Sequence, residues 1–202
     1  MKIGEVMQMA PVIPVLVVKD VAHGLPVAQA LVKGGLPVLE VTLRTEAALD
    51  VIREMSKVEG SYVGAGTVLN ENQLGQAIDA GSQFIVSPGL TVPLGKAAIR
   101  AGVPFLPGVA TAGDIMRGFD LGLDRFKFFP AEAAGGIPAL KALCAPCADA
   151  RFCPTGGITP QTAANWLALP AVLCIGGSWI VPPGDLDLAG ISERARAATA
   201  LR

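Results

Sequence analysis

Short apolar runs alternate with longer helix-like segments along the whole chain, and this alternation restricts the possible folds more than any other feature. The runs begin at intervals of about 19 to 26 residues, the length of one strand-and-helix unit. Eight such runs occur, at 12–18, 37–41, 62–65, 84–86, 103–107, 125–129, 151–154 and 171–175. Strict alternation of this kind predicts a parallel sheet with helices packed against it.

The segments between the runs carry the pattern of amphipathic helices. The clearest lie at 24–32, 46–57, 73–80, 94–101 and 112–119. Thr45 and Asn70 are candidate N-caps, because each directly precedes a glutamate near an expected helix start. Glycines close most of these segments, at 34–35, 60, 81, 102 and 122.

Eight units predict an α/β fold, a closed (β/α)8 TIM barrel, as a single catalytic domain over residues 1–202. A helix at 3–9 precedes the first strand, and we expect it to cap the bottom of the barrel. An open flavodoxin-like sheet is the alternative, but it leaves some of the strands without a place. Catalytic residues of such barrels lie at the carboxyl ends of the strands, so polar residues there are the candidates for function.

Composition excludes several classes of protein. Charged residues make up 16% of the chain and apolar residues 51%, and the mean hydropathy is +0.52, so the chain is not disordered. The net charge is −1 and no block of like charges occurs, which argues against nucleic acid or a membrane surface as partner. The many apolar residues favour an oligomer, in which some of them are covered.

Residues 152–184 carry no charge, but prolines and glycines interrupt the segment throughout, so it is not a membrane span. The start of the chain does not resemble a secretory signal. A single histidine, His23, cannot supply a zinc site, and we expect no metal and no other cofactor. The cysteines fit no metal site and are expected to be reduced in a cytoplasmic protein: Cys144, Cys147, Cys153 and Cys174.

Lys127 and Glu40 stand out because they lie inside apolar strand runs, Lys127 among three phenylalanines. Apolar surroundings disfavour an ammonium and favour the neutral amine, which can attack a ketone to form a Schiff base. The alternative is a lysine at a strand end whose ammonium reaches solvent.

Strand alternation places Glu40, Thr42 and Arg44 on one face near the top of the second strand. A carboxylate there can move protons, and an arginine can bind a substrate carboxylate through two parallel hydrogen bonds. A buried ion pair of Glu40 with Arg44 that only stabilises the barrel is the alternative.

Paired glycines end the last two runs, Gly156–Gly157 and Gly176–Gly177, and a helix is expected to start after each pair. Backbone N–H groups at such turns bind anions, and the loops after strands seven and eight are the usual phosphate site of this barrel. Ser178 adds a hydroxyl group there. Thr67, at the end of the third run, can donate to a carboxylate.

Long motifs at these positions resemble the 2-keto-3-deoxy-6-phosphogluconate (KDPG) aldolase family, from residue 11 to residue 182. They are LEVTLRT (39–45), GAGTVL (64–69), FIVSPGL (84–90), RFKFFPAE (125–132), RFCPTGGI (151–158) and CIGGSW (174–179). The resemblance implies a class I Schiff-base aldolase of the Entner–Doudoroff pathway. Such an enzyme cleaves 2-dehydro-3-deoxy-6-phospho-D-gluconate to pyruvate and D-glyceraldehyde 3-phosphate, often also cleaves 4-hydroxy-2-oxoglutarate, and is usually a homotrimer.

The resemblance also implies a role for individual residues. It assigns the Schiff base to Lys127, the proton shuttle to Glu40, and the pyruvate carboxylate to Arg44 and Thr67. It assigns the stereochemistry at the new carbinol to Thr155. It assigns the phosphate contacts to Gly156, Gly157, Gly177 and Ser178. Ala134 departs from the family, where a polar residue is common, and we expect it to alter the loop after strand six without removing activity.

Two other classes of function stay open from the residues alone. One is a phosphate-binding barrel isomerase or epimerase, in which Lys127 acts only through its charge. The other is a non-catalytic assembly subunit, which would be expected to lack Lys127 or Glu40.

Overall fold

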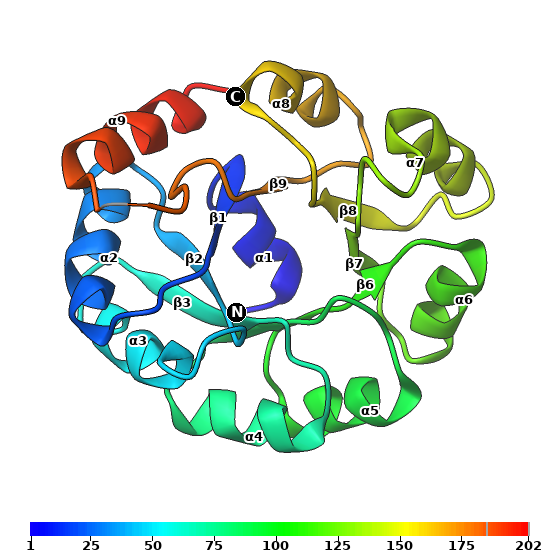
Figure 1. Cartoon of the computed structure of the whole chain (residues 1–202). Helices are drawn as coiled ribbons and strands as arrows, with labels where there is room; N and C mark the ends of the chain where they lie inside the picture. The colour runs from blue at the N-terminus through cyan, green and yellow to red at the C-terminus, as the bar shows by residue number, and fades with distance from the viewer. Residues whose placement is uncertain (185, 202) are drawn as a thin grey trace.

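The computed structural model describes residues 1–184 and 186–201 and shows strands enclosed by a ring of helices (Figure 1). The strands are β1 (Val12–Leu16), β2 (Val38–Thr42), β3 (Tyr62–Gly66), β4 (Phe84–Val86), β5 (Phe105–Leu106), β6 (Gly108–Val109), β7 (Arg125–Phe128), β8 (Arg151–Pro154) and β9 (Ile175–Gly177). The helices are α1 (Ile3–Gln8), η1 (Val21–His23), α2 (Gly24–Lys33), α3 (Ala48–Met55), α4 (Glu71–Asp79), α5 (Val92–Ala101), α6 (Ala112–Asp120), α7 (Gly136–Cys144), α8 (Pro160–Leu167) and α9 (Leu188–Thr199).

Parallel pairing closes the strands into the predicted (β/α)8 barrel. One sheet has the order β5-β4-β3-β2-β1-β9 and the other β6-β7-β8. Only Pro107 separates β5 from β6, so these two short strands together form the fifth position of the barrel. Parallel bridges from Phe152 to Val172 and from Thr155 to Gly176 join β8 to the segment that contains β9. The prediction of a closed barrel is therefore confirmed.

The helix α1 lies across one end of the barrel, as predicted for 3–9 (Figure 1). Its Val6 and Met7 are fully buried. They belong to a cluster inside the barrel that also contains Val38, Phe84 and Cys174. This apolar cluster fills the interior behind the site described below and leaves the opposite end of the barrel for polar side chains.

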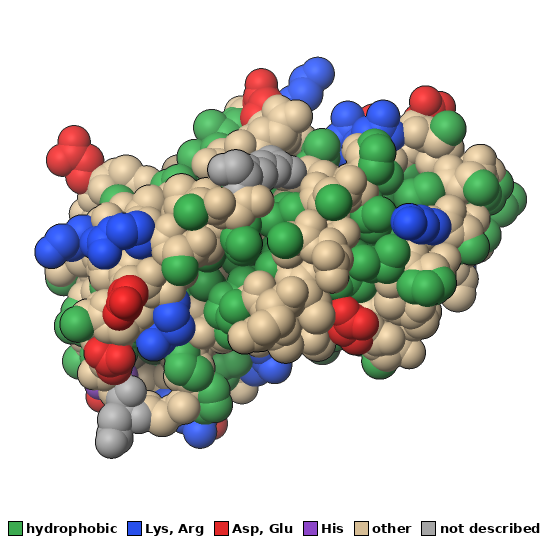
Figure 2. Space-filling model, turned by 90° about the horizontal axis from the view of Figure 1, so that it is seen from above, with side chains coloured by type: hydrophobic (Ala, Val, Ile, Leu, Met, Phe, Trp, Pro, Cys, Tyr) green, Lys and Arg blue, Asp and Glu red, His purple; other side chains and the backbone are tan. Residues whose placement is uncertain are grey.

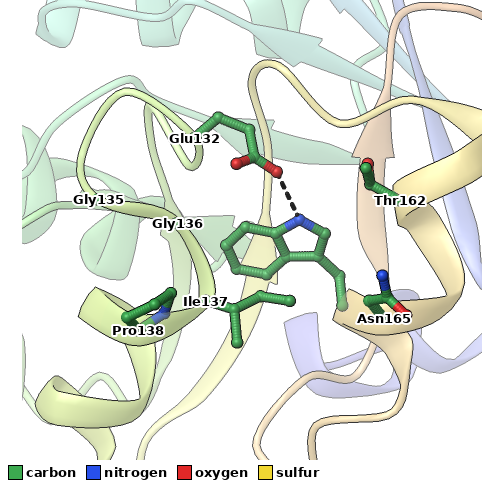
Figure 3. A pocket seen from close by; sticks show the side chains of 8 residues that line it. Glu132, Gly135, Gly136, Ile137, Pro138, Thr162 and Asn165 are labelled. Carbon is green, nitrogen blue, oxygen red and sulfur yellow. Dashed lines mark hydrogen bonds between the residues drawn. The ribbon is translucent and has the colours of Figure 1, made fainter.

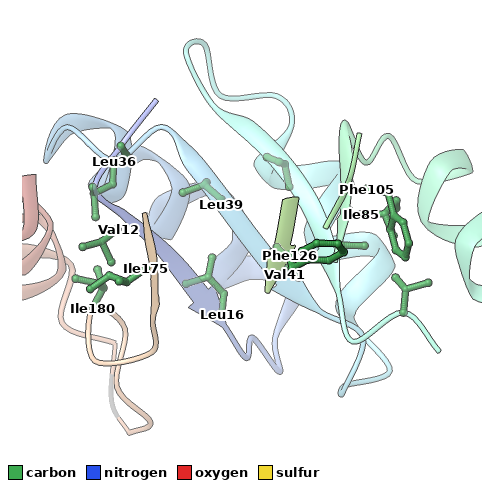
Figure 4. Close-up of a cluster of buried hydrophobic side chains, with 14 of the residues drawn as sticks. Val12, Leu16, Leu36, Leu39, Val41, Ile85, Phe105, Phe126, Ile175 and Ile180 are labelled. Carbon is green, nitrogen blue, oxygen red and sulfur yellow. The ribbon is translucent and has the colours of Figure 1, made fainter. Parts of the chain in front are cut away.

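Alternation along β2 separates the two sides of the barrel wall. Leu39 and Val41 belong to the core between strands and helices, part of which Figure 4 shows, whereas Val38 belongs to the interior cluster. The buried Glu40 and Thr42 share the parity of Val38. The pattern of β2 therefore directs its two polar side chains into the barrel.

Several element boundaries differ from the sequence-based expectations. The fifth run, expected over 103–107, is divided at Pro107, which has no N–H for a sheet hydrogen bond. The eighth, expected over 171–175, is a strand only from Ile175 to Gly177. The helix expected over 46–57 begins at Ala48, and Thr45 does not cap it because its hydroxyl donates to Val18 O.

Other local predictions are confirmed. The Asn70 side chain accepts from Gln73 N at the start of α4. Gly102 ends α5 with φ +67°. Within the residues that the structure describes, no helix is long and apolar enough to cross a membrane.

Candidate active site

Lys127 of β7 and Glu40 of β2 meet inside the barrel. The Lys127 Nζ atom lies 3.0 Å from Glu40 Oε1, and their side chains are only 6% and 4% exposed. The ammonium also lies 5.3 Å from the centre of the Phe129 ring. Lys127 therefore does not reach out to solvent, and Glu40 pairs with it rather than with Arg44.

Two contacts hold Glu40 in place. Strand pairing sets Glu40 beside Val15 and Gly64. Above it, a Cβ atom on Gly66 would lie 2.2 Å from Glu40 Oε1, so only glycine at position 66 leaves room for the carboxylate. The glycine at position 66 therefore allows β3 to approach the Glu40 carboxylate directly.

Arg44 lies beyond the end of β2 in a turn and is exposed at the rim. Its Nε atom donates to Thr42 Oγ1 at 3.2 Å. Thr42 in turn donates to Leu16 O of β1 at 2.8 Å. The hydrogen bond to Thr42 therefore holds Nε of the Arg44 side chain in place. The rest of the guanidinium is available to a ligand at the mouth of the barrel.

Thr67 follows β3 and is half-buried, with φ +59°. A β-branched residue rarely adopts this left-handed conformation, because its Cβ crowds the following carbonyl. No local sequence pattern indicates this conformation. Such a conformation costs energy and is common where a side chain or backbone group must face a ligand.

Thr155 follows β8 and is buried in the barrel. Its Oγ1 atom would lie 2.2 Å from a Cβ on Gly176, so β9 can approach only with glycine there. The hydroxyl lies 3.4 Å from Cys153 O, a long and weak hydrogen bond. The donor of Thr155 is thus free to turn toward a ligand in the barrel.

Gly156 and Gly157 form the predicted turn between β8 and α8, with φ +104° and +80°. The helix α8 begins three residues later, at Pro160, after Thr159. Its N-terminus therefore stands behind the turn, as expected for an anion site.

The second glycine pair differs from its prediction. Gly176 and Gly177 are buried within β9, and Gly177 pairs with Pro14. The next helix, α9, begins only at Leu188, so no helix N-terminus follows Ser178 directly. Ser178 itself is exposed just after the strand. The contribution of this loop to an anion site rests on its backbone and the serine hydroxyl, not on a helix dipole.

Sequence reasoning missed Glu132, which lies in the loop after β7. Its Oε1 atom accepts from Trp166 Nε1 of α8 at 2.9 Å, and the bond borders a cavity of about 510 Å³ between α7 and α8 (Figure 3). A Cβ on Gly157 would lie 2.8 Å from its Cβ and Cγ atoms. Its place in the motif RFKFFPAE was the available signal.

The single histidine and the four cysteines are the remaining candidates for chemistry. Within residues 1–184 and 186–201, no three His, Cys, Asp or Glu side chains cluster as metal ligands. His23 is exposed in η1. All four cysteines are thiols rather than halves of a disulfide, and burial, with the neighbouring Cys147 thiol, raises the pKa of Cys144 above its ordinary value. A raised pKa keeps the thiol protonated and poorly nucleophilic.

Comparison with known proteins groups this chain with aldolases. A family model described as KDPG and KHG aldolase matches residues 3–193. The 2-dehydro-3-deoxy-phosphogluconate aldolase of Zymomonas mobilis is 57% identical over 200 residues, which cover 99% of this chain and 96% of the relative. A crystal structure of the Z. mobilis ZM4 enzyme with 3-phosphoglycerate, also 57% identical, has a TM-score of 0.98 over 99% and 96% of the two chains.

Two further relatives are similar over most of the chain. The KHG/KDPG aldolase of Escherichia coli is 56% identical over 178 residues, 88% of this chain and 84% of the relative. The KDPG aldolase of Legionella pneumophila is 41% identical, with a TM-score of 0.94 over 98% of both chains. Its structure holds pyruvate captured at low pH as a covalent carbinolamine intermediate.

Proposed function

The chain belongs to the KDPG and KHG aldolase family, and we propose that it is a class I aldolase acting through a Schiff base on Lys127. Its substrate is 2-dehydro-3-deoxy-6-phospho-D-gluconate, which it cleaves to pyruvate and D-glyceraldehyde 3-phosphate in the Entner–Doudoroff pathway. The observation that carries this proposal is the buried contact of Lys127 Nζ with Glu40 Oε1 at 3.0 Å. An amine and a carboxylate side by side supply both the nucleophile and the proton acceptor that the reaction needs.

The first half of the reaction builds the imine. The proton of the Lys127 ammonium passes to Glu40, and the free amine attacks the C2 ketone to give a carbinolamine. The former ketone oxygen leaves as water, with a proton returned from Glu40, and a protonated imine remains. The carbinolamine held by the L. pneumophila relative supports this route.

The second half breaks the C3–C4 bond. Glu40, directly or through a water, takes the proton of the C4 hydroxyl, and the electrons of the C3–C4 bond move into the protonated imine to form an enamine. D-Glyceraldehyde 3-phosphate leaves with its new aldehyde. Glu40 then protonates C3, and water hydrolyses the imine to release pyruvate and the Lys127 amine.

Further residues bind the two ends of the substrate. Arg44 and Thr67, at the ends of β2 and β3, hold the pyruvate carboxylate. Thr155, buried beside Gly176, orients the carbinol and so sets its configuration. The phosphate is held by the backbone N–H groups and hydroxyl of Gly156, Gly157, Gly177 and Ser178. Binding at the phosphate end places the C4 hydroxyl near Glu40, which contributes to the rate by orientation.

The same machinery accepts 4-hydroxy-2-oxoglutarate. This substrate has the ketone, carboxylate and hydroxyl that Lys127, Arg44 and Glu40 recognise, and it lacks the phosphate. The name of the E. coli KHG/KDPG aldolase supports both substrates. Without phosphate contacts, cleavage of the smaller substrate is expected to be the less efficient of the two.

The enzyme works as a homotrimer. Apolar side chains are exposed on the neighbouring helices α5 and α6: Val92 and Ile99 are 40% and 47% exposed, and Met116 and Phe119 are 61% and 37% exposed. Apolar side chains also gather between sparse charges on the side of the barrel seen in Figure 2. Covering such surface favours association. Light scattering should give three times the mass of the chain.

All four cysteines are thiols, which supports a cytoplasmic location, where thiols stay reduced. Metal plays no part in the proposed steps. Extensive chelation should therefore leave turnover intact, whereas activity lost to a chelator and restored by a divalent cation would overturn this view.

Pyruvate release measures the proposed activity directly. The purified protein is mixed with either 2-keto acid, and pyruvate is assayed with and without a chelator. Release from both substrates, faster from the phosphorylated one, is the expected result. No pyruvate release from either substrate, together with no borohydride-trapped adduct, would favour an isomerase or epimerase in which Lys127 acts only through its charge.

A further inference from the structure

Glu132 connects three segments that surround the substrate-facing turn Gly156–Gly157. Its backbone N–H donates to Gly156 O at 3.1 Å, beside a bond of 2.8 Å from Ala131 N to Thr155 O. Its side-chain stem packs so closely on Gly157 that a Cβ there would lie 2.8 Å away. The loop after Lys127 is therefore fastened to the proposed phosphate turn at two consecutive residues.

The carboxylate of Glu132 adds a third connection. It accepts from Trp166 Nε1 at 2.9 Å, and Trp166 is fully buried on α8, the helix that the turn leads into. The indole ring also packs on Phe128, with ring centres 6.2 Å apart. Phe128 follows Lys127 directly in β7. The Trp166 side chain therefore contacts both the strand of the nucleophile and, through Glu132, the loop after β7 that packs on the glycine turn.

We infer that the hydrogen bond between Glu132 and Trp166 positions the Gly156–Gly157 turn for the phosphate and makes the enzyme select phosphorylated substrate. Both are positioning residues, because the Glu132 carboxylate accepts from Trp166 and the Trp166 side chain is fully buried on α8. The inference rests on the proposed function, because it takes the turn to be the phosphate site. Glycines at φ +104° and +80° have wide conformational freedom, so the turn needs neighbours to fix the direction of its N–H groups.

The charge of Glu132 and its positioning role predict opposite effects of a substitution on phosphate binding. A carboxylate near a phosphate repels it, so removing its charge would strengthen phosphate binding. Positioning predicts weaker phosphate binding when the hydrogen bond is lost. Glu132→Gln removes the charge and keeps a carbonyl acceptor, whereas Glu132→Ala removes both. The pair of variants therefore separates the two effects.

The test compares KM and kcat on the phosphorylated substrate and on 4-hydroxy-2-oxoglutarate. Glu132→Ala and Trp166→Phe should each raise KM for the phosphorylated substrate by roughly three- to tenfold. This factor corresponds to the net free energy of one ordinary hydrogen bond. KM for 4-hydroxy-2-oxoglutarate should stay near the wild-type value. Glu132→Gln should have a KM for the phosphorylated substrate close to the wild-type value, because its side-chain carbonyl can still accept from Trp166 Nε1. The double variant Glu132→Ala/Trp166→Phe should be little worse than either single one, because both remove the same bond.

Asn165→Ala is the matched control, since Asn165 lines the same cavity from the same helix and should leave both KM values unchanged. Equal changes on the two substrates, or a lower melting temperature with unchanged KM ratio, would overturn the inference. A wild type that cleaves neither substrate would contradict the proposed function instead. Glu132 is exposed, so Glu132→Ala remains informative if Trp166→Phe fails to fold.

Discussion

Lys127 and Glu40 form a buried ion pair across the barrel, with Nζ and Oε1 3.0 Å apart, although the two residues are 87 positions apart in the chain. The pairing removes Arg44 as the partner of Glu40, because Arg44 bonds to Thr42 at the rim. Two charges seldom occupy such a place for stability alone, since burying them costs most of what their attraction returns. A role in proton transfer gives the pair a function that an apolar pair could not supply.

Glu40→Gln tests that role, because it keeps the shape of the side chain and removes the basic carboxylate. Cleavage should fall by roughly 10²–10⁴, the usual contribution of a positioned acid–base group. Pyruvate should still be trapped on Lys127 after long incubation. NMR in deuterated water should show slower exchange of the pyruvate methyl protons, in parallel with cleavage. Exchange at the wild-type rate combined with a lower melting temperature would make Glu40 a structural residue.

Gly66→Ala tests whether the position of Glu40 matters. The new methyl group would lie 2.2 Å from Glu40 Oε1 and must push the carboxylate away from Lys127. We expect kcat to fall about 10²-fold, the effect of a displacement of about 1 Å at a reacting group. Gly75→Ala is the matched control, since it meets nothing within 4 Å on the exposed side of α4. Equal activity of both variants would show that Glu40 tolerates displacement.

Ser178→Asp tests the phosphate site. A carboxylate at the proposed place of the dianion repels it, so kcat/KM on the phosphorylated substrate should fall roughly a hundredfold. Activity on 4-hydroxy-2-oxoglutarate should fall much less, because that substrate has no phosphate. Steady-state kinetics on both substrates gives the answer, and equal losses would mean that Ser178 supports the fold.

Asp114 supplies a pH dependence of stability away from the site. Burial raises the pKa of its carboxyl, but hydrogen bonds from Ala110, Thr111 and Arg117 outweigh this and hold the pKa below its ordinary value. A lowered native pKa stabilises the fold above the unfolded value of about 3.9, and this contribution disappears as pH falls through the native pKa.

Asp114→Asn should therefore unfold more easily than the wild type at neutral pH, by about 1 kcal/mol for a weakened helix cap. Urea unfolding at several pH values measures the difference. The gap between the two proteins should shrink once pH falls below about 3.9. A gap that stays constant or widens in acid would contradict the stated cause of the pKa shift.

The eight strands and most helices follow from the sequence because apolar periodicity reflects burial on one or both faces. The end of the barrel at β9 was misread, since Gly176 and Gly177 are typical of turns. Their glycine identity comes instead from packing: a Cβ on Gly176 would strike Thr155, and a Cβ on Gly177 would strike Val12 of β1 as well as Trp179. Contacts between segments distant in sequence decide such positions, and local pattern does not contain them.

The site shows the same division between local and distant information. Strand alternation placed Glu40 on one face with Thr42, and Lys127 was singled out because it lies in an apolar run, but neither pattern gives the distance between the two side chains. The phenylalanines beside Lys127 were expected to surround its amine, yet Phe126 and Phe128 pack outward in the core between strands and helices. Burial inside the barrel, next to the Phe129 ring, produces the apolar setting that the sequence had suggested for a different reason.

The most direct test of the account is borohydride trapping with pyruvate, read by mass spectrometry of the intact protein and its peptides. The wild type should gain the mass of one reduced pyruvate, located on Lys127. Lys127→Ala should gain nothing and have no aldolase activity, whereas the surface variant Lys141→Ala should behave as the wild type. An adduct on another lysine, or trapping that persists in Lys127→Ala, would contradict the assignment of Lys127 as the nucleophile.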